Sequence, residues 1–225
     1  IGRLPFGAGC QAALLTASAK LIAVLLVLAD HDALWLLCDA DRAAAVSQTL
    51  DRYLFTEQVT ITNHERQQAV LAVQGPRTFE HLTQALGTVV SLPHPGDHVV
   101  TQLQHIPLRL IRHTLTGEVG VLCLCPTDHV RTVWELLRGR AVSSGVRCVG
   151  WEALNVSRIE AGIPWFGLDM DEANLLPETG LETVAVSDTK GCYLGQEIIA
   201  RMQTYGSASK KLMGLLAEGD QVPER

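Results

Sequence analysis

The residues from Leu21 to Ala29 form the most apolar stretch of the chain, and they restrict its fold most strongly. Nine residues are too few to cross a bilayer, because a membrane-spanning helix needs roughly 20 apolar residues. The stretch is rich in Leu and Val and does not alternate with polar residues. It therefore predicts a β-strand that is buried on both faces, and no membrane segment.

Further strand-like runs follow and are mixed with helical patterns. The predicted strands cover residues 34–38, 59–62, 70–73, 108–113 and 119–125. The predicted helices cover residues 44–53, 78–86, 128–138, 151–161 and 198–203. Because the order lacks the strict strand–helix–strand rhythm of parallel sheets, we predict an α+β fold of two subdomains with antiparallel sheets. The Pro- and Gly-rich stretch 91–97 predicts a linker between them.

Composition narrows the class of protein. A chain of 225 residues with 47% hydrophobic and 19% charged residues suits one large or two small globular domains. The net charge of −6 argues against direct, sequence-independent binding of nucleic acids. The start of the chain lacks a signal peptide pattern, and the six cysteines lack secretory spacing, so a bacterial cytoplasm is the expected location. Cys123 and Cys125 share one face of a strand, where core packing is favoured over metal binding.

The octet Lys190–Glu197 (KGCYLGQE) carries the clearest chemical signal. It places Cys192 close to Lys190, between two glycines and before a predicted helix. Nearby positive charge and a helix N-terminus favour the thiolate, which is the form that acts as a nucleophile or metal ligand. A small buried cysteine in a glycine-rich turn is the alternative. Basic residues gather around the octet and suit an anionic ligand or a solvated face: Lys190, Arg201, Lys210 and Lys211.

Glu160 breaks a local rule near the end of the predicted helix 151–161. Gly162 and Pro164 end this helix, and Arg158 in its last turn complements the helix dipole. Glu160 opposes the dipole at a cost of about 0.3–1 kcal/mol. Such conflicts are typical of functional sites, although pairing of Glu160 with Arg158 or another cation would also account for it.

The octet and the block Arg158–Asp169 (RIEAGIPWFGLD) together resemble the YgfZ-type folate-binding proteins, which are relatives of the glycine-cleavage T-protein (GcvT) family. Weaker similarities lie at 74–76, 116–120, 175–178 and 180–182. The resemblance implies a GcvT/YgfZ-like fold with two ferredoxin-like antiparallel subdomains and a C-terminal β-barrel. We therefore expect an N-terminally truncated subdomain at 1–92, a second subdomain at 93–206, and the start of a truncated barrel at 207–225.

The resemblance also implies the ligand, tetrahydrofolate or a folate derivative. In relatives with bound folate, the glutamate that corresponds to Glu160 contacts the pterin ring, whose 2-amino and N3–H groups match two carboxylate oxygens. Cys192, as a reactive thiol, and Lys190 are the candidate catalytic residues, and no metal site is expected. The candidate folate-binding residues are Glu160, Arg158, Trp165, Tyr193, Gln196, Glu197 and Arg201.

Two classes of function follow from the resemblance. The first is a folate-binding factor in iron–sulfur cluster assembly or repair, which acts indirectly on tRNA modification through iron–sulfur client or assembly proteins. The second is a folate-dependent aminomethyltransferase. Such enzymes carry an early aspartate for the substrate amine, whereas the matching stretch Thr16–Ala23 contains no acid. The sequence therefore favours the factor. A third alternative is a truncated chain that lacks its barrel and performs neither role.

Overall fold

The structure is a computed structural model that describes residues 4–139, 145–187, 189–206 and 208–216. Its first sheet is antiparallel and three-stranded, in the order β1-β2-β3. The strands are β1 (Gly9–Leu15), β2 (Leu21–Ala29) and β3 (Leu34–Leu37). A short 3-10 helix, η1 (Ala40–Arg42), and the helix α1 (Ala43–Asp51) follow β3.

The second sheet is antiparallel and four-stranded, in the order β4-β7-β6-β5. Its strands are β4 (Gln68–Gln74), β5 (His98–Leu103), β6 (Ile106–Arg112) and β7 (Gly120–Pro126). The helix α2 (Thr78–Leu86) follows β4, and the 3-10 helix η2 (Thr127–His129) leads into α3 (Val130–Gly139) after β7. The two antiparallel sheets confirm the predicted α+β class.

Strand β2 lies in the middle of the molecule, as its sequence predicts. Leu26 and Leu28 on one face pack against Ile111, Leu122 and Leu124 of the second sheet. The residues on the other face of β2, together with Val46 of α1, form a separate core cluster that includes Ala23, Leu25 and Val27. Both faces are covered, which explains why β2 shows no alternation of apolar and polar residues.

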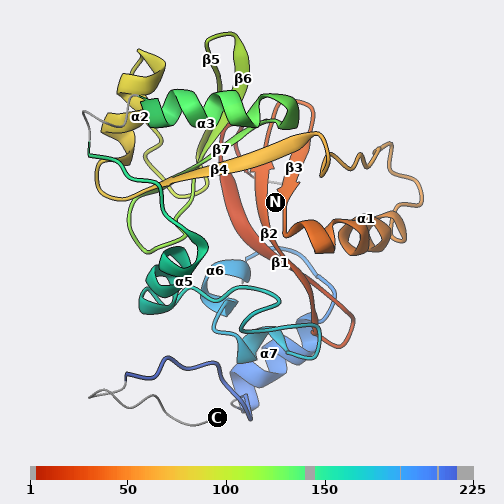
Figure 1. Cartoon of the computed structure of the whole chain (residues 1–225). Helices are drawn as coiled ribbons and strands as arrows, with labels where there is room; N and C mark the ends of the chain where they lie inside the picture. The colour runs from red at the N-terminus through yellow and green to blue at the C-terminus, as the bar shows by residue number, and fades with distance from the viewer. Residues whose placement is uncertain (1–3, 140–144, 188, 207, 217–225) are drawn as a thin grey trace.

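Helices α2 and α3 cover the outer face of the second sheet (Figure 1). Leu82 of α2 and Val133 of α3 are completely buried against this face. Cys123 and Cys125 of β7 belong to the same cluster, which confirms that both side chains point to one face of the strand and pack in the core. Burial raises the pKa of Cys123 to about 12, so its thiol stays protonated at neutral pH.

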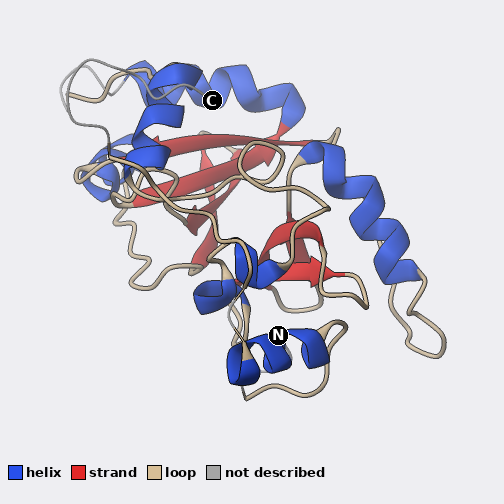
Figure 2. Cartoon of the chain, turned by 90° about the horizontal axis from the view of Figure 1, so that it is seen from below, coloured by secondary structure: helices blue, strands red, loops and turns tan. Residues whose placement is uncertain are grey.

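The remaining helices lie at the opposite end of the molecule from α2 and α3 (Figure 1). Seen from below, helices surround the strands (Figure 2). They are α5 (Trp151–Glu160), the 3-10 helix η3 (Leu176–Glu178), α6 (Glu182–Ala185) and α7 (Gln196–Tyr205). This region packs on the end of the β1–β2 hairpin, where Leu21 meets Leu176 and Ile199 in one buried cluster. Backbone hydrogen bonds join Leu21 to Asn174 and Leu176 to Ala19. The hairpin thereby carries the C-terminal region.

Several sequence expectations need correction. Strands β1 and β5 are absent from the sequence prediction. Strand β1 contains Gly and Ala, which have weak strand preference, and it forms by pairing with β2. Strand β5 contains the strand formers Val99, Val100 and Thr101, but it begins directly after the Pro- and Gly-rich stretch 91–97 and pairs with β6. Residues 59–62 form no strand, since no neighbouring strand pairs with them. Residues 208–216, within the expected start of a barrel, form no strand either, and 217–225 lie outside the described residues.

The grouping of the strands also differs from the expectation. Strand β4 falls inside the expected first subdomain, residues 1–92, but it pairs with β7 over its whole length. Within the stretch 91–97, Gly96 packs against the first sheet, because a Cβ atom added to it would lie 2.3 Å from the Gly9 carbonyl oxygen. In the sequence, the change from the first sheet to the second therefore falls at α1, between β3 and β4, and not at the stretch 91–97. The domain boundaries themselves stay a prediction. Among the described residues, no helix has both the length and the apolar character needed to cross a membrane.

Candidate functional site

Glu160 is the last residue of α5, and the chain leaves the helix directly after it. Gly162 adopts a left-handed conformation, with φ of +67°. Its N–H donates to Ile159 O at 2.9 Å, and the Ile163 N–H donates to Arg158 O at 2.8 Å. These two bonds form a Schellman motif, which satisfies the last carbonyl groups of the helix. The Glu160 side chain is exposed and has no hydrogen bond or ion pair with the described residues.

Arg158 turns into the protein, away from Glu160. Its side chain is 4% exposed, and it forms an ion pair with Asp169. It also donates to Asn155 Oδ1 at 2.8 Å and to Ile163 O at 3.2 Å. The expected alternative, a pair between Arg158 and Glu160, is therefore wrong. The predicted contact between Arg158 and folate stays a prediction, and the observed contacts are internal.

Asp169 was missed by sequence reasoning, although it closes the same sequence block. Its Oδ2 atom accepts the Trp165 N–H at 2.7 Å in addition to the Arg158 guanidinium. Trp165 is half-buried, and its ring lies 5.1 Å from that of Trp151 and 5.2 Å from the Arg158 guanidinium carbon. The side chain of Trp165 is thus held between an aromatic ring and a cation, beside the end of α5.

The octet turn lies against the β1–β2 turn. Gly195 is the N-cap of α7 with φ of +80°, and a Cβ atom added there would lie 2.8 Å from the Ala19 Cα atom. Ala19 itself is completely buried and has φ of +59°. Tyr193 packs on the adjacent apolar cluster, and its N–H donates to Gln196 Oε1 at 3.3 Å. Close contact with the backbone of Ala19, which is distant in the sequence, therefore requires glycine at position 195.

Cys192 is exposed, which contradicts the alternative of a buried structural cysteine. Helix α7 begins only at Gln196, and the influence of a helix dipole decays within about one turn. Lys190 lies two residues before Cys192 in the chain, and its Nζ atom lies 4.7 Å from the Tyr193 ring centroid. Glu197 and Arg201 are exposed on α7. Among the described residues, no group of three or more His, Cys, Asp or Glu side chains is placed to hold a metal ion.

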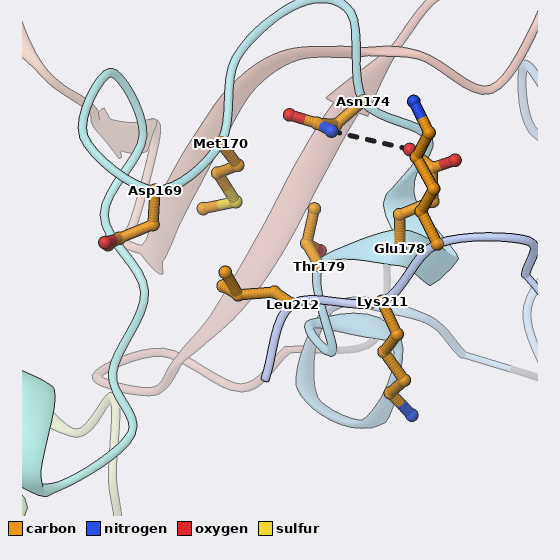
Figure 3. Close-up of a pocket in the computed structure, with 8 residues that line it drawn as sticks. Asp169, Met170, Asn174, Glu178, Thr179, Lys211 and Leu212 are labelled. Carbon is orange, nitrogen blue, oxygen red and sulfur yellow. Dashed lines mark hydrogen bonds between the residues drawn. The ribbon is translucent and has the colours of Figure 1, made fainter. Parts of the chain in front are cut away.

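A cavity of about 190 Å³ adjoins this region (Figure 3). Its walls include Asp169, Lys210, Lys211 and Leu212. The Lys211 ammonium points away from the cavity in Figure 3 and lies 3.7 Å from Glu182. Lys211 therefore does not contribute to the expected cluster of basic side chains around one anionic ligand. The remaining lining residues are Met170, Asn174, Glu178 and Thr179.

The predicted site residues fall into two groups. Arg158 and Trp165 contact each other at the end of α5, where Glu160 is the last helical residue. Tyr193 contacts both Lys190 and Gln196 before and at the start of α7. The segment 163–181 connects the two groups in sequence and carries Asp169 and η3. Arg158 and Trp165 of the first group are held by Asp169 of this segment, whereas the second group lies against Ala19 of the β1–β2 turn.

Comparison with known proteins agrees with this architecture. Residues 4–189 match the family described as the GCVT N-terminal domain. The chain belongs to this GcvT family. The fold is also found in the crystal structure of glycine cleavage system aminomethyltransferase T from Bartonella henselae, with a TM-score of 0.77, 22% identity, and coverage of 91% of this chain and 55% of that one. The GcvT-like fold that the resemblance implied is thereby confirmed.

Curated GcvT relatives carry transferase names. The "Putative transferase At1g60990, chloroplastic" of Arabidopsis thaliana is 28% identical over 96% of this chain and 49% of its own length. An "Aminomethyltransferase" of Synechococcus is 27% identical over 86% of this chain and 52% of its own length. One from Mycobacterium leprae is 30% identical over 86% of this chain and 51% of its own length. The chain thus spans about half the length of these relatives.

Proposed function

We propose that this chain supplies the tetrahydrofolate-binding part of a one-carbon transferase of the aminomethyltransferase type. Glu160 carries the proposal. Its carboxylate is exposed, it lacks a partner among the described residues, and the dipole of α5 disfavours it. The paired 2-amino and N3–H donors of a pterin would compensate such a carboxylate directly. Trp165 is half-buried and stacks with Arg158 of the same helix end, and it offers an aromatic wall for the ring.

Titration calorimetry with tetrahydrofolate tests the proposal. The substitution Glu160→Gln removes one acceptor and the charge of a paired contact, so the affinity is expected to fall by about 1.5–3 kcal/mol. Glu152→Gln is the matched control, because Glu152 is an exposed glutamate in the first turn of the same helix. It is expected to leave the affinity unchanged. Equal affinities for the wild-type protein and Glu160→Gln would remove Glu160 from the folate site.

A second candidate function is a folate-binding factor for iron–sulfur cluster assembly or repair, with an indirect effect on tRNA modification. Two observations favour it. The stretch Thr16–Ala23 has no acid for a substrate amine, and the octet with the exposed Cys192 begins directly after the residues matched to the GcvT domain. The names of the relatives favour the transferase instead. Iron–sulfur client or assembly proteins would be partners only under this second candidate.

An assay with aminomethylated carrier protein and tetrahydrofolate separates the two candidates. Protein-dependent formation of methylene-tetrahydrofolate is the result expected of a transferase, and it should decrease in the Glu160→Gln variant. Folate binding without turnover would favour the second candidate. In that case the Cys192→Ser variant should bind folate normally but fail to restore the activity of iron–sulfur enzymes in cells that lack the protein.

A further inference from the structure

The Arg158 guanidinium joins a side chain of α5 to the backbone that follows Glu160. Nε donates to Asn155 within α5, and Nη1 donates to the Ile163 carbonyl, just after the helix. Glu160 lies between Arg158 and Ile163 in the chain. Together with the Schellman bonds, these contacts fix the direction in which the chain, and with it Glu160, leaves α5.

Asp169 makes this arrangement possible, because a buried guanidinium needs a compensating charge. The Asp169 side chain is 23% exposed and the Arg158 side chain 4%, so solvent screens this pair far less than a surface pair. Asp169 also accepts the Trp165 N–H, and its own N–H donates to Trp165 O at 3.0 Å. One carboxylate therefore orders both the end of α5 and the turn that carries Trp165.

We propose that Asp169 is a positioning residue of the folate site, which acts through Arg158 on Glu160 without touching the ligand. This inference rests on the proposed role of Glu160. It assigns to the pair a purpose beyond stability, since the same pair determines where the carboxylate and the Trp165 ring stand relative to each other.

A double-mutant cycle with tetrahydrofolate binding as the readout tests the proposal. Asp169→Asn keeps an oxygen for the Trp165 N–H but removes the charge that holds Arg158. Its affinity loss is expected to be about tenfold when Glu160 is present and less than twofold in the Glu160→Gln background. Thermal unfolding of every variant checks that the titrated protein is folded. A purely structural effect would be the same in both backgrounds.

Glu172→Gln is the matched control. Glu172 lies on the same loop and pairs with Arg42, but its side chain is 57% exposed. Its removal is expected to change the affinity less than twofold in either background. If Asp169→Asn does not fold, Asp169→Glu replaces it, because it keeps the charge and shifts it by one methylene group. The loss of affinity is then smaller but must again disappear in the Glu160→Gln background.

The outcomes distinguish this inference from the proposed function. If Glu160→Gln weakens binding and the loss caused by Asp169→Asn is equal in both backgrounds, the positioning role is wrong while the folate site stands. If Glu160→Gln has no effect, the proposed site is lost and the positioning role is lost with it. Disappearance of the Asp169 effect in the Glu160→Gln background establishes the positioning role.

Discussion

The turn after α5 and the octet turn before α7 both present a candidate functional side chain on a glycine-containing bend, but they are held in different ways. The α5 turn is fixed by partners that are close in sequence, from Asn155 to Asp169. The octet turn is fixed by contact with Ala19, far away in the sequence. A functional turn can thus be stabilised by local charged side chains or by a distant backbone, and only the first kind leaves a pattern in the neighbouring sequence.

The largest expected effect concerns the charged partner of the α5 turn. Arg158→Met leaves the Asp169 carboxylate without its cation in a mostly buried position, and should lower the free energy of unfolding by about 3–4 kcal/mol. Urea unfolding measures this loss. Arg131→Met is the control, because Arg131 forms an exposed pair with Glu135 on α3 and should cost about 0.5 kcal/mol or less. Similar losses for both variants would contradict the view that buried charges hold this turn.

The two glycines provide a direct comparison of the turns. Gly195→Ala places a methyl group against the Ala19 backbone in addition to the strain of a left-handed residue, and should cost about 2–3 kcal/mol. Gly162→Ala has open space around the added methyl group, so only the backbone strain remains, about 1 kcal/mol. Chemical unfolding of both variants gives the difference. A loss for Gly162→Ala equal to or above that for Gly195→Ala would show that the contact with Ala19 does not hold the octet turn.

The smallest expected effect concerns the chemistry of the octet turn. Cys192 and Cys148 are exposed, whereas Cys123 and Cys125 are buried, so iodoacetamide should label the first two and spare the other two in the native protein. Lys190→Met removes the cation near Cys192 and should slow its labelling about twofold at neutral pH. Cys148 serves as the internal control, and peptide mass spectrometry measures both rates. An unchanged rate at Cys192 would show that Lys190 does not favour the thiolate.

Sequence patterns predicted the elements whose conformation depends on neighbouring residues in the chain. The apolar run of β2, the helical spacing of α2 and the Gly–Pro end of α5 all appear in the structure near the expected residues. Strand β1 was missed because its Gly and Ala residues have little strand preference of their own, and pairing with β2 decides its conformation. Strand β5 was missed although Val99, Val100 and Thr101 favour a strand. The placement of β4 in the second sheet was also missed, because it depends on pairing with β7, which is distant in the sequence.

In the candidate site, too, some features follow from the neighbouring sequence and others only from tertiary contacts. The sequence by itself determined that Glu160 stands at a helix end that disfavours it, that Cys192 lies before a helix, and that both belong to blocks resembling folate-binding proteins. Tertiary structure decided that Arg158 turns inward to Asp169, that Gly195 packs on Ala19, and that Lys211 points to Glu182. The physical reason is that dipole and propensity effects act within about one helical turn, whereas the partner of a buried charge or of a close backbone contact is chosen by the folded chain.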